Sequence, residues 1–582
     1  MATETLSAQF ARGTVSEVHT ETTKNLCRLS AGFYGALQLW ASGFLMNPDG
    51  ISYLDIGDAF FHGNRHAVLN AYWSPLYPLV LGAVRWALPV KTQWEFPLIH
   101  TVNFLIFIVV IACFEFFWSG LLQAKTEPIR VAARQQSAYW LAGYALFVLT
   151  MHAQRAVMHV SPDLIVTGVL FLAAGLLLRV RFANSSNLQY AALGATLGVG
   201  YLAKAAMLPI ATIFFFSVAA MHRPWRLRSL KRFATMLLVF AAISGPFIIA
   251  LSNSKTRLTF GDSGRLNWAW SINGVTRFAF WKGGEPDSGA PVHPPRQLWH
   301  SPDAYEFVSP FSATYPVWYD PTFWYDGVKP HFNFRQLSAA ILRNLYDMSL
   351  FYRQYYETAF PIVLLLLLAH ADHSRMVRDL LHKYWPILLV GTGALLMYCL
   401  VNVQPRYIAG FVFLLVGVLL VVSDVLIGEN DRMARAFAIA LVVAVLPLIA
   451  HGLLDSRREN RSARAQVDEA LALREVGIRP GEKIGYIGNA FFEYWPKLAR
   501  VSIVAEIPTR ISDNVPSTVD DHDAPASIFW QSPEAVKASI FQAMYKAHVE
   551  AVVAHSPGTG TPSGWQPVRG SDLCVKFLSS NQ

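Results

Sequence analysis

The residues best suited to chemistry are acidic side chains at the ends of long apolar segments. Asp49 follows the apolar segment 29–46, and Asp163 precedes the apolar segment 164–179. A carboxylate at the level of a lipid headgroup is well placed to act as a general base or to hold a divalent cation. Each residue could instead cap a helix by accepting its free N–H groups, so the sequence leaves both interpretations open.

Two cationic residues are informative because of where they lie. Lys204 separates the apolar segments 188–202 and 207–221, where an ammonium group is costly unless it faces a cavity, a counter-ion or a ligand. Arg406 precedes the apolar segment 408–427, at a helix end where positive charge runs against the orientation derived below. A lipid-linked phosphate would suit both cations. A lysine that reaches the interface from a tight turn, and an ordinary interfacial arginine, are the alternatives.

Other candidates surround these four residues. Tyr53 follows Asp49 in the first loop, and Arg155 and His159 precede Asp163 in the second. The loop 252–358 is rich in tryptophan and contains aspartates beside tyrosines. Such aromatic faces suit a sugar, but membrane interfaces also collect tryptophan and tyrosine, and the interfacial interpretation is the default for most of them.

Composition indicates which elements position these residues. Hydrophobic residues make up 53% of the 582 residues and charged residues only 15%, too few charges to cover a soluble protein. The apolar blocks approach the length of a helix that crosses a bilayer. We expect about eleven spans, at residues 29–46, 97–118, 137–151, 164–179, 188–202, 207–221, 233–251, 359–368, 385–401, 408–427 and 436–453.

Loops rich in lysine and arginine alternate along the chain, which predicts an orientation. The positive-inside rule places these loops in the cytoplasm, provided that segment 75–88 lies along the outer surface without crossing. The net charge of +9 then reflects topology and does not indicate a nucleic-acid partner, because the basic residues flank apolar blocks. We expect a cytoplasmic segment 1–28 and a membrane domain 29–455 with external loops 47–96 and 252–358.

The tail, residues 456–582, has a different character. A helical stretch at 465–476 ends at Gly477, and short apolar runs at 483–487, 501–504 and 549–553 predict strands. These features indicate a small α/β domain outside the cell membrane. Gly485 and Gly488 lack the rest of a nucleotide-binding fingerprint, so no nucleotide cofactor is expected.

Taken in order, these segments resemble the C-type membrane glycosyltransferases, the group that includes the aminoarabinose transferases, the protein O-mannosyltransferases and the bacterial core-sugar transferases. The resemblance covers roughly residues 29–251 and little beyond them. It rests on these residues, in chain order: Asp49, Tyr53, Pro75, Pro78, Arg155, Asp163, Lys204, Arg406 and Tyr407.

The resemblance implies a multi-pass transferase of the bacterial inner membrane. Such an enzyme would move a hexose or pentose from a polyprenyl phosphate to a lipid, glycan or protein acceptor at the outer face. The resemblance implies Asp49 as the catalytic carboxylate. Many relatives have two adjacent acidic residues there, whereas Gly50 follows Asp49, so a divalent cation held by Asp49 and Asp163 stays open. The substrate contacts that it implies are Tyr53, Arg155, His159, Asp163, Lys204 and Arg406.

Two other classes of function fit part of the sequence. A transporter or flippase for a lipid-linked glycan would use Lys204 and Arg406 to neutralise a moving anion, and it predicts internally repeated halves, which the sequence lacks. A non-catalytic scaffold would use the tail to bind partners in the cell envelope. The long external loop and the exported tail favour the transferase.

Overall fold

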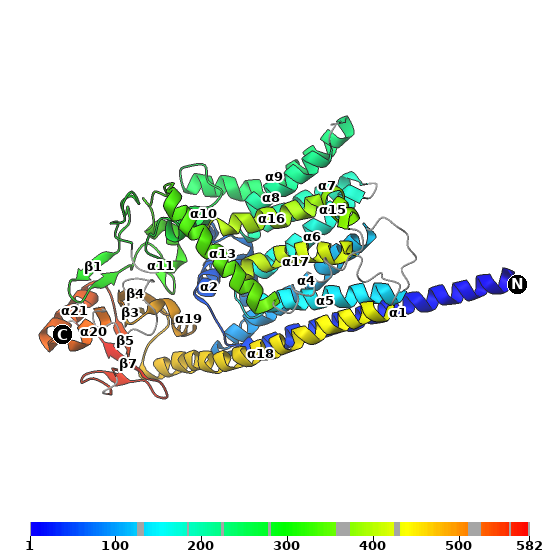
Figure 1. The fold of residues 1–582 in the computed structure, drawn as a ribbon. Helices are drawn as coiled ribbons and strands as arrows, with labels where there is room; N and C mark the ends of the chain where they lie inside the picture. The colour runs from blue at the N-terminus through cyan, green and yellow to red at the C-terminus, as the bar shows by residue number, and fades with distance from the viewer. Residues whose placement is uncertain are drawn as a thin grey trace.

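The computed structural model describes residues 2–124, 133–182, 185–222, 226–277, 281–356, 373–423, 431–509, 525–557 and 560–579. Long helices form a bundle with a β-sheet at one end, and the two termini lie at opposite ends of the molecule (Figure 1). Along one face of the bundle, α1 (Ala2–Ser42) runs beside α18 (Asp431–Val476), and α5 (Ala133–Ala153) packs against both.

The rest of the bundle consists of helices at the expected apolar blocks and of α15 (His373–His382), which was not predicted. Their buried aromatic and aliphatic side chains form one core, in which Phe114, Phe171 and Phe413 pack together. The expected span 359–368 lies outside the described residues. The helices are α4 (Glu95–Gln123), α6 (Asp163–Phe182), α7 (Asn187–Ala203), α8 (Met207–Met221), α9 (Leu227–Ser254), α15 (His373–His382), α16 (Trp385–Cys399) and α17 (Pro405–Val422).

The chain is a multi-pass membrane protein. In the described part of the chain, five helices are long and apolar enough to cross a bilayer. A sixth span results if the helices Ser374–His382 and Trp385–Cys399, which meet at a bend of 78°, count as one. The count of eleven is not confirmed, and α7 and α8, with 17 and 15 residues, are short for a span. The five helices of the described part that are long and apolar enough to cross a bilayer are Thr92–Gln123, Asp163–Phe182, Leu227–Ser254, Pro405–Val422 and Arg435–Val476.

Residues 47–96, which the sequence predicts as the first external loop, contain two helices in close contact, α2 (Pro48–Phe61) and α3 (Leu76–Ala87). They touch at Gly57 and Gly82, where a Cβ on Gly57 would lie 2.4 Å from the carbonyl oxygen of Pro78. Only glycine permits this approach. Within the segment expected along the outer surface, α3 has 12 residues, too few to cross a bilayer.

The sheet combines the tail with residues 252–358, which the sequence predicts as the long external loop. Its strand order is β1-β2-β4-β3-β5-β7-β6, and β3 is parallel to both β4 and β5. The three strands predicted in the tail are present, whereas β1 and β2 come from the external loop and were not predicted. The strands are β1 (Arg296–Trp299), β2 (Ala304–Glu306), β3 (Lys483–Ile487), β4 (Ser502–Ile507), β5 (Ala551–His555), β6 (Gln566–Pro567) and β7 (Leu573–Phe577).

The remaining helices surround this sheet or belong to the loops. The helix predicted at 465–476 is the end of α18, which passes residue 455 without a break and stops before Gly477, whose φ is +121°. The long helix α13 was not predicted. These helices are η1 (Arg65–Val68), η2 (Thr92–Trp94), α10 (Ser263–Ser271), α11 (Pro316–Tyr319), α12 (Pro321–Trp324), α13 (Phe334–Tyr356), η4 (Ala490–Phe492), α19 (Trp495–Ala499), α20 (Pro525–Gln531) and α21 (Glu534–Lys546).

Buried ion pairs attach the tail to the first external loop. Lys497 of α19 has its Nζ 2.6 Å from Asp55 and 2.8 Å from Asp58, both on α2. Burial opposes the charge of Lys497, but the two carboxylates outweigh it and raise the pKa of the lysine. Arg500 of the tail also pairs with Glu95, at 2.6 Å. The tail is therefore attached directly to the helix that carries Asp49.

Replacing Lys497 by Met should destabilise the protein by about 3–5 kcal/mol, because two carboxylates would stay in a buried site without this counter-charge. Thermal unfolding of the detergent-purified protein measures the change. Lys537→Met is the matched control, since Lys537 pairs at 2.9 Å with Glu534, whose side chain is 89% exposed. The control should cost at most about 0.5 kcal/mol. Equal losses in the two variants would contradict the assignment.

Glu506 of β4 is hydrogen-bonded to residues of both the tail and the loop 252–358, and burial changes the protonation state of its carboxyl group. It accepts hydrogen bonds from the Tyr315 hydroxyl at 2.8 Å and the Ala490 N–H at 3.1 Å. Burial raises the pKa of Glu506 from its ordinary value of 4.5 to about 7, and the hydrogen bonds only partly oppose this. Folding therefore favours the protonated form, and the associated stability is complete below pH 4.5 and is lost as the pH rises through 7.

This shift predicts a stability difference that depends on pH. Between pH 5.5 and pH 8, Glu506 should remove about 2 kcal/mol of stability from the wild-type protein. Glu506→Gln cannot ionise and should lack that contribution. Thermal unfolding of both proteins at the two pH values isolates the effect of Glu506, and parallel changes in both would show that the carboxyl is not the titrating group.

Candidate active site

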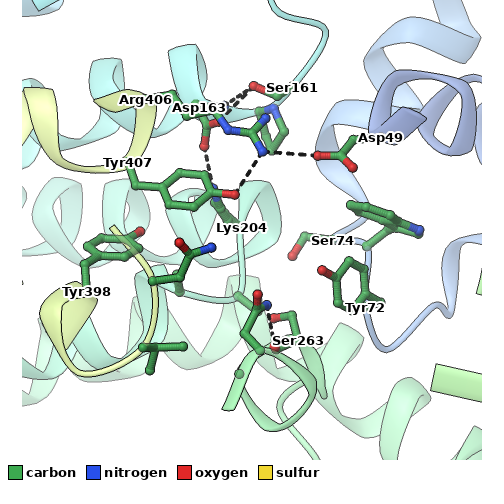
Figure 2. A pocket seen from close by; sticks show the side chains of 18 of the residues that line it. Asp49, Tyr72, Ser74, Ser161, Asp163, Lys204, Ser263, Tyr398, Arg406 and Tyr407 are labelled. Atoms are coloured by element: carbon green, nitrogen blue, oxygen red, sulfur yellow. Dashed lines mark hydrogen bonds and ion pairs between the residues drawn. The ribbon is translucent and has the colours of Figure 1, made fainter. Parts of the chain in front are cut away.

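A cavity of about 280 Å³ opens beside the start of α2, where several segments meet (Figure 2). Asp49, Asp163, Lys204 and Arg406 all line it. They come from α2, from the start of α6, from the turn between α7 and α8, and from the start of α17. The fold thus brings together four residues that the sequence singled out separately.

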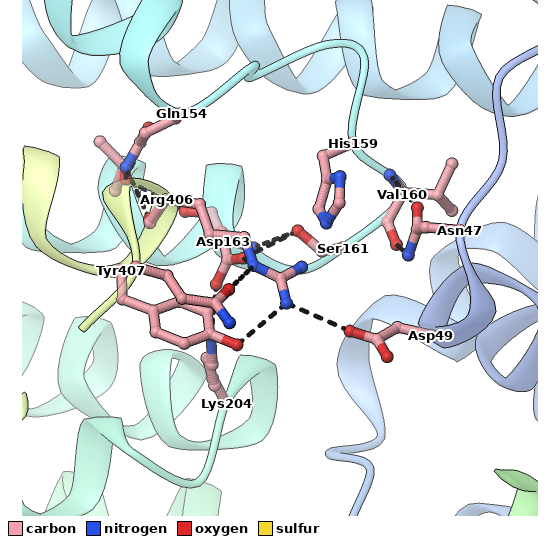
Figure 3. A network of polar contacts seen from close by, with 12 residues as sticks. Asn47, Asp49, Gln154, His159, Val160, Ser161, Asp163, Lys204, Arg406 and Tyr407 are labelled. Carbon is pink, nitrogen blue, oxygen red and sulfur yellow. Dashed lines mark hydrogen bonds and ion pairs between the residues drawn. The ribbon is translucent and has the colours of Figure 1, made fainter. Parts of the chain in front are cut away.

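The four charges compensate one another in pairs. Lys204 Nζ lies 2.5 Å from Asp163 Oδ1. The Arg406 guanidinium lies between the two carboxylates, with Nη2 3.4 Å from Asp49 Oδ2 and Nε 3.7 Å from Asp163 Oδ2 (Figure 3). Each carboxylate therefore faces at least one cation, which offsets the cost of burial.

Helix ends position three of these residues. The chain turns at Lys204, because α7 ends at Ala203 and α8 begins at Met207. Asp163 is the first residue of α6, where the helix dipole favours a carboxylate, and it accepts a hydrogen bond from the Ser161 hydroxyl at 2.9 Å. Arg406 follows Pro405 in the first turn of α17. All three side chains therefore meet at the cavity without interrupting a helix.

Asp49 lies in the first turn of α2, and its carboxylate contacts side chains of other elements. Besides Arg406, it accepts a hydrogen bond from the Trp318 indole N–H, with 3.2 Å between Nε1 and Oδ1. The N-cap residue of α2 is Asn47, and its side chain bonds to the backbone of Val160 instead of capping the helix (Figure 3). These contacts orient the carboxylate toward the cavity.

Tyrosines in the cavity wall interact with the cations or with other aromatic side chains. The Tyr407 hydroxyl accepts a hydrogen bond from Arg406 Nη2 at 3.0 Å, and its ring centroid lies 3.8 Å from Lys204 Nζ, a cation–π distance. Tyr53 also lines the cavity, edge-on to Trp73 with 5.0 Å between ring centroids. The sequence had identified Tyr53 as a contact, but Tyr407 only as a neighbour of Arg406.

The structure places the other two predicted contacts differently. Arg155 is 44% exposed, pairs with Glu459 of α18, and does not line the cavity. His159 lies close to the charged cluster (Figure 3) but does not line the cavity. Burial lowers the pKa of His159 to about 3, and the Arg406 charge adds to this effect, so the imidazole is neutral at physiological pH.

Asp49 and Asp163, the two carboxylates considered for a divalent cation, both face a cation of the protein itself. The Arg406 guanidinium lies between them, and among the residues that the structure describes no cluster of three or more His, Cys, Asp or Glu side chains is arranged to hold a metal ion. Mg²⁺ is commonly held by one or two carboxylates together with waters and substrate phosphates, so this pair neither assigns nor excludes a divalent cation. We therefore assign no chemical step to a metal.

Comparison with solved structures identifies the fold. ArnT from Cupriavidus metallidurans in the apo state is 12% identical, with a TM-score of 0.51, over 93% of this chain and 95% of that one. This chain has the C-type glycosyltransferase fold. The resemblance inferred from the sequence is thereby confirmed for the fold. No family model matches the sequence, and neither does any curated protein.

Two further structures are similar at lower scores. The same ArnT bound to undecaprenyl phosphate is 12% identical over 94% of this chain and 97% of that one, with a TM-score of 0.47. The Archaeoglobus fulgidus oligosaccharyltransferase in the apo form is 12% identical over 91% and 69%, with a TM-score of 0.44. Identities this low concern the fold alone, so the function has to be argued from the site.

Proposed function

We propose that this protein is a glycosyltransferase that moves a sugar, a hexose or a pentose, from a polyprenyl phosphate to an acceptor at the outer face of a bacterial inner membrane. One observation carries the proposal: a carboxylate, Asp49, lies in the same cavity as two cations, Lys204 and Arg406. Sugar transfer from a lipid phosphate needs a base for the acceptor and positive charge for the leaving group.

The proposed reaction is a single displacement. Asp49 accepts the proton of an acceptor hydroxyl, whose oxygen forms a bond to the anomeric carbon. The bond from that carbon to the phosphate oxygen breaks, and its electron pair stays on the polyprenyl phosphate. Because the acceptor attacks from the face opposite the leaving group, the configuration at the anomeric carbon inverts.

The cations stabilise the phosphate as it gains charge. Lys204 and Arg406 act as preorganised donors, and Asp163 holds them by its contacts at 2.5 Å and 3.7 Å. Tyr53 and the neighbouring aromatic side chains Tyr72 and Trp73 line the same cavity and offer a surface for the sugar ring. The acceptor is a lipid, a glycan or a protein.

The proposal includes a topology. Residues 1–28 are cytoplasmic, residues 29–455 form the membrane domain with about eleven spans, and residues 456–582 lie outside. This orientation is supported by the position of α2 and α10, which flank the cavity at the end of the bundle nearest the sheet (Figure 1). The cavity and the tail then share the outer side, where the acceptor is found.

Asp49→Asn should slow sugar transfer by roughly a hundredfold or more, because the amide cannot accept the acceptor proton. Glycan analysis of a deletion strain identifies the missing sugar, and purified protein in proteoliposomes is then assayed with that sugar on polyprenyl phosphate. Asp303→Asn is the control, since Asp303 pairs with Lys282 at 3.2 Å and does not line the cavity. Full transfer by a stably inserted Asp49→Asn protein would indicate transport or a scaffold role instead.

Lys204→Gln should weaken the binding of undecaprenyl phosphate by about tenfold or more, because one of the two phosphate-facing charges is lost. Native mass spectrometry of the purified protein with this lipid measures the affinity. Lys255→Gln is the matched control, because Lys255 contacts Thr322 at 3.1 Å and does not line the cavity. Unchanged affinity in Lys204→Gln would mean that the lysine serves the fold and not the donor.

A further inference from the structure

Trp318 touches the proposed catalytic carboxylate from outside the cavity. Its side chain is 3% exposed and does not line the cavity. Its indole N–H donates to Asp49 Oδ1 at 3.2 Å, while Arg406 approaches the other oxygen, Oδ2, at 3.4 Å. The two oxygens of Asp49 therefore have different partners on different elements.

This division of partners has a consequence for the orientation of the carboxylate. The terminal torsion of an aspartate is soft, so an ion pair with Arg406 alone leaves the carboxylate plane free to turn. A donor fixed on Oδ1 holds that plane and keeps Oδ2 directed at Arg406. Small losses of orientation at a reacting group cost large factors in rate.

Neighbouring residues hold Trp318 rigidly. Its backbone carbonyl accepts hydrogen bonds from the Ser52 hydroxyl at 2.9 Å and from the Trp73 indole N–H at 3.1 Å. Its ring lies against that of Trp270 at 27°, with 6.0 Å between centroids. Because Ser52 belongs to α2, Trp318 is tied to the same helix that carries Asp49.

The tail supplies a further contact to Trp318. Phe491 of η4 meets the Trp318 ring edge-on, at 80° and 5.1 Å between centroids. Glu506 holds both sides of this contact, because one of its oxygens accepts from the N–H of Ala490 and the other from the hydroxyl of Tyr315. The backbone N–H of Trp318 in turn donates to the backbone carbonyl of Tyr315 at 3.1 Å.

We propose that Trp318 is a positioning residue for Asp49 and that Phe491 of the tail fixes Trp318 in place, so that the exported tail completes the active site. The inference rests on the proposed transferase function. It assigns the tail a direct part in the transfer step.

The first test is Trp318→Phe, which keeps an aromatic ring and removes the N–H. It should lower kcat by roughly tenfold or more while the KM for the sugar donor stays unchanged, because Lys204 and Arg406 are intact. Trp324→Phe is the matched control: Trp324 is also buried in the external loop, but its N–H donates at 3.0 Å to the carbonyl of Pro316. The control should retain wild-type kcat.

The second test replaces the contact from the tail. Phe491→Leu keeps an apolar side chain but loses the aromatic edge, and it should lower kcat in the same direction with an unchanged donor KM. Phe492→Leu is the control, because Phe492 is the next residue and its side chain is 54% exposed. Thermal unfolding of all four variants shows whether any loss of kcat merely follows a loss of stability.

The deciding measurement is Trp318→Phe in the Asp49→Asn background. If Trp318 acts through Asp49, its substitution should have no further effect there, whereas an independent structural effect would add to that of Asp49→Asn. Wild-type kcat in Trp318→Phe, or equal losses in Trp318→Phe and Trp324→Phe, would overturn the inference and leave the transferase standing. Full activity of Asp49→Asn would instead remove the proposed function.

Discussion

A charged side chain at membrane depth must be matched by an opposite charge, and the contact between Lys204 and Asp163 meets this requirement at the centre of the structure. Either charge without the other would carry a large desolvation cost at that position. Because the two side chains must touch, the turn between α7 and α8 has to meet the first turn of α6, and Arg406 brings the start of α17 to the same point. The charged cluster in the cavity wall results from the meeting of these helix ends.

Much of the bundle could be predicted from the sequence because apolar blocks are a local signal. The helices α4, α6, α8 and α9 lie at expected blocks, and the strands β3, β4 and β5 lie at the short apolar runs of the tail. The helix α13 was missed because its apolar residues are spaced along one face and form no continuous run. Strand β1 pairs with β2, and β2 joins the sheet through β4, a segment about two hundred residues away, so no local pattern predicts either strand.

The site residues also fall into those that the sequence reveals and those that only the folded chain reveals. Lys204 and Arg406 could be identified because a cation against an apolar background is conspicuous in a sequence. Arg155 lies in the segment that leads to Asp163, but its side chain points to α18, because neighbours in sequence need not face the same way. Trp318 could not be separated from the other tryptophans of its loop, since only the folded chain shows which indole N–H reaches a carboxylate.

The continuous helix α18 makes the tail mechanically part of the membrane domain. Its 46 residues extend for about 69 Å, roughly twice the thickness of the hydrocarbon layer, and only the short turn 477–482 separates its end from strand β3 of the sheet. A change in the tilt of this helix therefore displaces its far end as the arm of a lever does. Since bilayer thickness influences helix tilt, we expect the thickness of the surrounding lipid to affect the position of the sheet.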